Sequence, residues 1–217
     1  GYFLSSLYWI SISLTFDHNF KFLIPVTIIL IPTFLGIFYG SATVCFIISK
    51  PKNIVSSFLV FSLFFGIFEF IRGSILTGFP WNLIAYSFVN QLEILSITSI
   101  IGTYGFNLFC ISLFASPAIF ILRETKKDTG VCVVFLILLL LFYLHGSSYK
   151  KTFNSLDVTN YDYKVRVIGS NISLDRFYSN IDPISVINEL IDISEPQKED
   201  KTIFIWPEGI LPDVSQE

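Results

Sequence analysis

The chain has 217 residues, a mean hydropathy of +0.67, 53% hydrophobic residues and only 14% charged residues. This composition excludes an ordinary soluble domain, and a net charge of −3 gives no basic surface for nucleic acid. Residues 1–148 hold 12 of the 31 charged side chains, and residues 149–217 hold 19. We therefore expect a transmembrane helical domain over 1–148 and a water-soluble region over 149–217. Since no methionine occurs, even at position 1, we expect the sequence to be a fragment.

Five membrane crossings are predicted in the first 148 residues, because about 20 apolar residues are needed to cross the hydrocarbon layer. Pro25 and Pro32 are expected to kink the second crossing. The segments are 1–16 (as the end of a crossing), 22–48, 54–68 with an extension to Arg72, 94–122 and 131–144.

Basic residues are concentrated in two loops, 50–52 and 123–127, which contain five of the Lys and Arg residues. The two loops fall on the same side if the crossings alternate, and the positive-inside rule makes that side cytoplasmic. We therefore expect residues 73–93 and everything after 148 to face outward.

The three cysteines show no metal-ligand spacing, and each lies in an apolar run: Cys45, Cys110 and Cys132. We therefore expect neither a metal nor a cofactor.

The outward stretch "FEFIRGSILTGFPWNLIAYSF" combines a charge pair with helix breakers. Glu69 and Arg72 are three residues apart, so they share a helix face and can neutralise each other in an apolar setting. Gly78 and Pro80 prevent a continuous helix. The pair is expected to fix a helix end, and the apolar loop is expected to be a re-entrant element or a lipid-contacting surface.

The charged C-terminal region predicts a β-α-β unit. Residues 164–169 alternate and are rich in β-branched side chains, Asp182-Pro183 is a helix start, and residues 202–206 form a short apolar strand. A β-α-β unit places its two strands side by side in parallel. The helix is expected to bury a stripe made of Ile184, Ile187, Leu190 and Ile191.

Glu208 follows the second predicted strand directly, at the edge where open α/β sheets bind their ligands. Trp206 is expected to keep water out and to raise the pKa of this carboxylate. A carboxylate in that position can accept a proton from a nucleophile. The alternative is that Glu208 caps a loop.

Two stretches together resemble the apolipoprotein N-acyltransferases. The segment "FEFIRGSILTGFPWNLIAYSF" resembles the family's E-x-x-R…TGFPW…GY signature, and "IFIWPEGILPD" resembles its IIWPE-x-x-x-P motif. "GYFLSSLYWI" and "IGTYGFNLF" are also similar to family segments, so the resemblance covers nearly the whole chain. It implies a multi-pass α-helical bundle in a bacterial inner membrane, followed by the beginning of a periplasmic α/β nitrilase-like domain.

The resemblance also implies a reaction. A cysteine accepts an acyl chain from a membrane phospholipid as a thioester and passes it to the α-amine of the diacylglyceryl-cysteine of an apolipoprotein. Glu208 corresponds to the catalytic general base. The family's oxyanion-stabilising lysine and nucleophilic cysteine are expected beyond position 217, so the fragment alone is expected to be inactive. Phe79, Trp81 and Tyr86 are expected to contact substrate.

The chain departs from the family pattern after its first soluble strand. It has Gly169-Ser170-Asn171 where Gln-Gly-Asn is usual, and Phe177 or Tyr178 near the usual place of a tryptophan. By resemblance Tyr178 is a candidate for the acyl pocket. Two competing interpretations stay open: a membrane-tethered amidase of the nitrilase type, and a transporter or scaffold in which Glu69 and Arg72 line a pathway.

Overall fold

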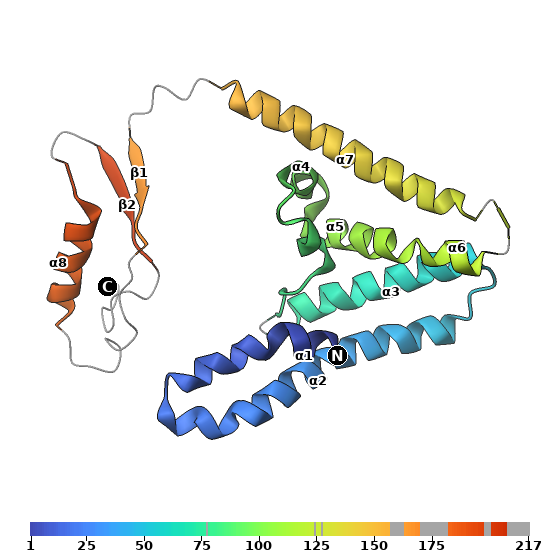
Figure 1. The fold of residues 1–217 in the computed structure, drawn as a ribbon, viewed down its shortest axis with the longest axis horizontal. Coiled ribbons are helices and arrows are strands. Elements are labelled where there is room, and N and C mark those ends of the chain that lie inside the picture. Colours follow the sequence, from blue (N-terminus) through green and yellow to red (C-terminus); the bar gives the residue numbers. More distant parts are fainter. Residues whose placement is uncertain are drawn as a thin grey trace. The chain divides into compact units, whose positions relative to one another are not determined.

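The computed structural model describes residues 1–76, 78–123, 125–126, 128–156, 163–169, 182–197 and 201–207. The chain divides into two compact units, Gly1–Ser155 and Leu156–Glu217 (Figure 1). The first unit is helical. Its elements are α1 (Tyr2–Leu7), the 3₁₀ helices η1 (Tyr8–Thr15) and η2 (His18–Leu23), α2 (Ile24–Ser49), α3 (Ile54–Ser74), η3 (Ile84–Phe88), α4 (Leu92–Leu95), α5 (Thr98–Ala115), α6 (Ala118–Leu122) and α7 (Gly130–Asn154).

Four helical segments of the described chain are long and apolar enough to cross a membrane: His18–Ser49, Ile54–Ser74, Thr98–Ala115 and Gly130–Asn154. The multi-span helical bundle is therefore confirmed, with four such segments where five crossings were predicted. Residues 1–16 divide into the short helices α1 and η1, so their part in a crossing stays a prediction.

The boundaries of α2 and α3 follow from local chemistry. Pro25 lies in the first turn of α2, where its missing N–H costs nothing, at the passage from η2 to α2; the kink expected there stays a prediction. Pro32 lies inside the helix. Lys50 ends α2 in the left-handed conformation, with φ 42°. Asn53 then caps α3, since its Oδ1 accepts a hydrogen bond from the Ser56 N–H at 2.8 Å.

The predicted crossing 94–122 is not one helix. It contains the end of α4, then α5 and α6; Gly102, with a positive φ of 72°, interrupts α5 from within, and Pro117 follows the end of α5. Hydropathy alone missed both breaks, since the glycine and the proline lie in an uninterrupted apolar run.

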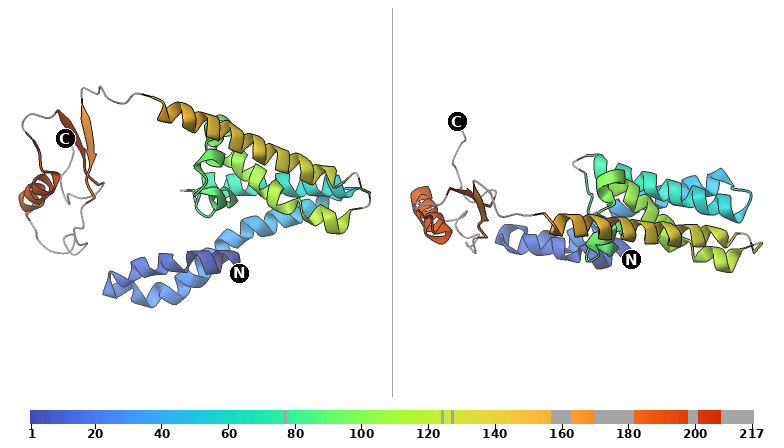
Figure 2. Two further views of the ribbon diagram at one scale, coloured as in Figure 1. Left: turned by 45° about the horizontal axis from the view of Figure 1, so that its top comes forward. Right: turned by 90° about the horizontal axis from the view of Figure 1, so that it is seen from above.

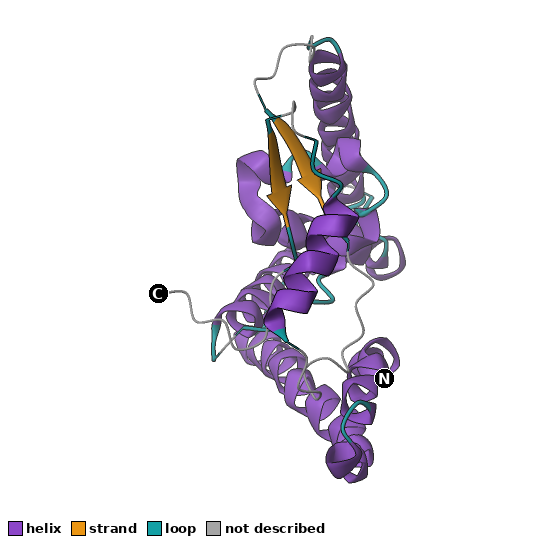
Figure 3. Cartoon of the chain, turned by 90° about the vertical axis from the view of Figure 1, so that its left-hand side faces the viewer, coloured by secondary structure: helices purple, strands orange, loops and turns teal. Residues whose placement is uncertain are grey.

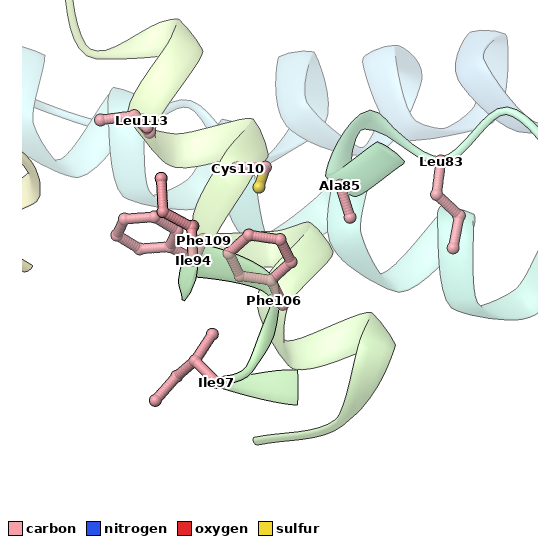
Figure 4. Close-up of a cluster of buried hydrophobic side chains, with 8 residues drawn as sticks. All are labelled: Leu83, Ala85, Ile94, Ile97, Phe106, Phe109, Cys110 and Leu113. Atoms are coloured by element: carbon pink, nitrogen blue, oxygen red, sulfur yellow. The ribbon is translucent and has the colours of Figure 1, made fainter. Parts of the chain in front are cut away.

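Two glycines, Gly73 and Gly146, let helices of the first unit approach each other closely. A Cβ atom on Gly73 of α3 would collide with the hydroxyl of Tyr104 on α5, and one on Gly146 of α7 would collide with the carbonyl of Glu93 on α4. Figure 1 shows α5 between α3 and α7, and Figure 2 gives two further views of the same arrangement. The largest buried cluster lies here (Figure 4) and contains Leu83, Ala85, Ile94, Ile97, Phe106, Phe109, Cys110 and Leu113.

An ion pair reinforces the contact between α4 and α7. Lys150 Nζ lies 2.6 Å from Glu93 Oε1, close to the site where Gly146 lets the two helices meet. The hydrogen bond from Lys150 holds the pKa of the Glu93 carboxyl below its usual value.

The described part of the second unit is a β-α-β unit, as predicted. Strands β1 (Lys164–Val167) and β2 (Thr202–Ile205) pair in parallel, with Lys164 opposite Thr202. Helix α8 (Pro183–Ser194) begins at Asp182, whose Oδ1 accepts a hydrogen bond from the Ile184 N–H at 3.1 Å. Figure 3 shows the two strands side by side with α8 near them.

The predicted apolar stripe of α8 is partly wrong. The buried positions are Val186, Leu190 and Ser194, whereas Ile184 and Ile191 are exposed. Spacings of four residues define this face, and Trp206 of the chain after β2 packs on it. The polar Ser194 belongs to the buried face because its hydroxyl accepts a hydrogen bond from the Trp206 indole. The stripe predicted from hydrophobic residues alone therefore lies partly on another side of the helix.

Candidate functional site

The centre of the candidate site is an ion pair on α3. Arg72 Nη2 donates a hydrogen bond to Glu69 Oε2 at 2.6 Å, and each residue is only 1% exposed. The spacing of three residues places both side chains on one helix face. Because either charge alone would be costly to bury, the two stabilise each other.

Arg72 also holds the loop that follows α3. Its Nη1 donates to the carbonyl oxygen of Phe79 at 2.7 Å and to that of Trp81 at 2.9 Å. In return the Phe79 N–H donates to the Arg72 carbonyl oxygen at 3.0 Å. One buried guanidinium therefore fixes the backbone of the loop against the end of its own helix.

A tight turn lets the chain fold back this way. Gly78 has a positive φ of 74°, and a Cβ there would lie 2.5 Å from the carbonyl oxygen of Gly73. Its N–H donates to the Ile75 carbonyl oxygen at 2.8 Å. A side chain at position 78 would therefore be strained both by the dihedral angle and by the close contact.

The loop presents aromatic side chains to its surroundings. Trp81 is 50% exposed and stacks on Trp9 of η1, with ring centroids 5.5 Å apart. Phe79 contacts Trp81 at 5.6 Å between centroids. The hydroxyl of Tyr86, which is also exposed, donates to the Pro80 carbonyl oxygen at 3.3 Å. The structure thus places Phe79 and Trp81 in the loop, and the hydroxyl of Tyr86 from η3 reaches the same loop.

Two apolar cavities flank this loop. One of about 550 Å³ lies between η1 and the loop and is lined mainly by Trp9, Phe16, Phe79 and Trp81. The other, of about 460 Å³, lies between α2 and the loop; its wall includes Phe34, Phe38 and Arg72. The buried cation therefore lies at the wall of an otherwise apolar cavity.

The first helix completes the surroundings of the ion pair. The guanidinium carbon of Arg72 lies 5.5 Å from the ring centroid of Phe3, within range of a cation–π contact. The Tyr2 hydroxyl donates to the Asn82 carbonyl oxygen at 2.9 Å, and the Asn82 side chain donates to Ser6 Oγ at 2.6 Å. Segments about 80 residues apart are thereby joined at the loop.

Two positioning residues were missed by the sequence analysis. Asn107 of α5 is 1% exposed, and its Oδ1 accepts a hydrogen bond from the Ala85 N–H at 3.0 Å. Asn82 links the loop to α1. The signal for Asn107 was available, because an amide inside an apolar span needs a hydrogen-bond partner. Its partner is a backbone group, which leaves no trace in the sequence.

The second unit positions the chain that leads to Glu208. Trp206 packs against Val186 and Leu190, and its Nε1 donates to Ser194 Oγ at 3.0 Å. Glu208 and Tyr178 lie outside the described residues, as do Ser170 and Asn171. The contact expected between Trp206 and the Glu208 carboxylate therefore stays a prediction.

Residues 1–116 match the model of the apolipoprotein N-acyltransferase N-terminal domain. Curated proteins of the same name include one from Rhodopseudomonas palustris, 28% identical over 98% of the chain and 41% of its own length. The protein from Brucella melitensis is 25% identical over 99% of the chain and 41% of its own length. The protein from Rickettsia prowazekii is 31% identical over 97% of the chain and 42% of its own length. The chain thus spans about 41% of the length of such relatives. No solved structure matches it.

Proposed function

The chain belongs to the apolipoprotein N-acyltransferase family, and on that basis we propose that it is part of an enzyme of lipoprotein biosynthesis. The reaction is transfer of an acyl chain from a membrane phospholipid to the α-amine of the N-terminal diacylglyceryl-cysteine of an apolipoprotein. The relatives' shared name supports this assignment. So does the matched range, 1–116, which contains the Glu69–Arg72 pair and the loop that Arg72 holds.

The observation that best supports the proposal is that Arg72 donates hydrogen bonds to the backbone carbonyl oxygens of Phe79 and Trp81. A phospholipid donor has to reach the reacting groups without leaving its apolar surroundings. A fixed loop with exposed aromatic side chains, flanked by cavities of about 460 and 550 Å³, suits the passage of acyl chains. In this account Phe79, Trp81 and Tyr86 contact the lipid substrates, and the Glu69–Arg72 pair keeps the loop in place.

In the first chemical step a cysteine thiol attacks the ester carbonyl of the phospholipid, and Glu208 accepts the thiol proton. The new carbon–sulfur bond forms, the ester carbon–oxygen bond breaks, and the lysophospholipid oxygen takes up the proton. In the second step the α-amine attacks the thioester, Glu208 accepts the amine proton, and the carbon–sulfur bond breaks as the amide forms. The released thiolate is reprotonated.

The nucleophile is none of the three cysteines in the chain, since Cys45, Cys110 and Cys132 belong to the apolar helices α2, α5 and α7. We therefore expect residues 1–217 alone to form no acyl-enzyme.

The parallel β-α-β arrangement of the second unit supports a nitrilase-like domain, because Glu208 follows β2 by three residues and would emerge at the ligand-binding edge. Tyr178 is proposed for the acyl pocket.

The basic loops support a location in the bacterial inner membrane, with the soluble domain on the periplasmic side. Residues 50–52 and 123–127 then face the cytoplasm.

The test is acyl transfer by the full-length protein that carries this chain, reconstituted in vesicles with isotope-labelled phospholipid and a diacylglyceryl-cysteine peptide. Mass spectrometry should show the label as an amide on the peptide's N-terminus. An amidase of the nitrilase type would instead hydrolyse a small amide in vesicles free of acceptor peptide, and a transporter or scaffold would leave both substrates unchanged. Either of those results contradicts the proposal.

A further inference from the structure

A third apolar crevice lies at the opposite end of α3 from the Phe79–Trp81 loop. Its volume is about 360 Å³, and it opens between α2, α3, α5 and α6. Phe58, one of its lining residues, precedes Arg72 by 14 positions on the same helix, which corresponds to roughly 21 Å along the axis. The crevice is therefore separate from the cavities that flank the loop.

Among the described residues, the wall of the crevice offers no free hydrogen-bonding side chain. Aromatic rings dominate it, with Phe46, Phe61 and Phe114 contributed by three different helices. Ser57 is the one polar residue in the described part of the lining, and its hydroxyl donates to the Asn53 carbonyl oxygen at 2.9 Å. A polar molecule would lose its hydration here without compensation, whereas a hydrocarbon chain would not.

Three of the four helices that border the crevice, α2, α3 and α6, have a cation within two residues of one end. Lys50 ends α2 four residues after Phe46, and Arg123 follows Leu122 at the end of α6. Lys52 precedes Ile54, the first residue of α3, by two positions. Within the described ranges, none of these three cations makes an ion pair with a carboxylate. Three exposed cations therefore lie close in sequence to residues that line the crevice.

We propose that this crevice binds one acyl chain of an anionic glycerophospholipid whose phosphate lies among Lys50, Lys52 and Arg123. Three of the helices that border the crevice, α2, α3 and α5, belong to segments long and apolar enough to cross a membrane, so the hydrocarbon of the bilayer is the solvent at its opening. Basic side chains near the bilayer surface attract anionic headgroups. The bound lipid ties α2, α3 and α6 together and is distinct from the acyl donor.

The experiment uses the full-length protein in bilayers of phosphatidylcholine that contain a small fraction of phosphatidylglycerol with a photoreactive group in its acyl chain. Irradiation should label peptides that contain Phe58, Phe114 or Ile119. Unlabelled phosphatidylglycerol should suppress this labelling, and additional phosphatidylcholine should not. The triple variant Lys50→Gln/Lys52→Gln/Arg123→Gln should reduce the headgroup preference by about fivefold for each cation removed.

Two variants separate the crevice from ordinary boundary lipid. Ala118→Phe fills the crevice from an exposed position and should abolish the labelling, whereas Thr43→Phe, on an exposed part of α2 outside the crevice, should not. Ala115→Leu provides the same filling test if Ala118→Phe lowers the yield of folded protein. Lys21→Gln, before the other end of α2, is the charge control. Labelling that persists after filling, or that shows no preference for phosphatidylglycerol, overturns the proposal.

Discussion

Arg72 binds the backbone of Trp81 across nine residues of sequence, with Nη1 2.9 Å from the carbonyl oxygen, while Nη2 of the same guanidinium pairs with Glu69. The carboxylate balances the charge of the buried cation through Nη2, and Nη1 binds the loop. The charge pair and the position of the aromatic loop therefore depend on one side chain.

Removing the arginine should destabilise the first unit more than removing both charges. Arg72→Met leaves Glu69 buried without its partner, and breaking a buried pair this way costs about 3–5 kcal/mol. The double variant Glu69→Leu/Arg72→Met should recover a substantial part of that loss. The measurement is the free energy of unfolding in detergent.

Activity should not recover in the double variant, because the carbonyl oxygens of Phe79 and Trp81 still lack their donor. Equal stability of the single and double variants would show that the Glu69 carboxylate does not need Arg72.

The partnership of Glu69 and Arg72 could be predicted from their spacing on one helix face. The carbonyl oxygens that bind Arg72 Nη1 could not be predicted, because every residue has a backbone carbonyl group and the sequence does not distinguish among them. Asn107 shows the same limit, since its partner is the Ala85 N–H. Contacts between side chains of complementary charge leave a signature, whereas contacts between a side chain and a distant backbone do not.

The elements with strong local signals were predicted well. The β-α-β order and the start of α8 at Asp182 follow from residue types at short range. The predicted crossing 94–122 failed because hydropathy averages over Gly102 and Pro117. The stripe on α8 was right for Leu190 and wrong for Ile184 and Ile191, because the face that packs on Trp206 also includes Val186 and the hydrogen-bonded Ser194. The position of Glu208 relative to any nucleophile stays a prediction.

Trp81→Ala should slow acyl transfer while the protein stays folded. The change removes a half-exposed ring that stacks on Trp9, a contact worth about 0.5–1.5 kcal/mol beyond its buried area. The measurement is the rate of transfer at limiting phospholipid, together with the unfolding temperature. Phe120→Ala is a matched control, since Phe120 is 52% exposed and lines neither cavity at the loop. A normal transfer rate in the Trp81→Ala variant would show that Trp81 only anchors the protein at the membrane interface.

The contact between α4 and α7 should weaken in acid. The pKa of Glu93 is lowered in the folded protein by the hydrogen bond from Lys150, so the stabilisation is present above the ordinary glutamate pKa of about 4.3 and is lost as the pH falls below it. Glu93→Gln should remove this part of the pH dependence. The measurement is the unfolding temperature of both proteins between neutral pH and pH 3. Identical curves for wild type and variant would exclude a role for the carboxylate.

The proposed orientation in the membrane predicts which loops are accessible. Single cysteines at His18 or Asn90 should react with an impermeant thiol reagent added outside intact inner-membrane preparations. Cysteines at Pro51 or Lys126 should react only after the membrane is opened. A variant lacking Cys45, Cys110 and Cys132 is the background for this labelling. The reverse pattern would overturn the orientation inferred from the basic loops.

The most direct test of the proposed chemistry is the trapping of the acyl-enzyme by full-length protein with Glu208→Gln. Glutamine keeps the size and hydrogen bonding of the side chain but cannot accept the proton, and loss of a positioned base costs about 10²–10⁴-fold in rate. Glu208→Asp should also be severely impaired, since a misplacement of about 1 Å can cost 10²-fold. After mixing with phospholipid, thioester formation by the glutamine variant should fall by at least about 10²-fold, with unchanged protein level and membrane insertion. Accumulation of the acyl-enzyme at the wild-type rate would contradict the account, because Glu208 would then cap a loop and not act as the base.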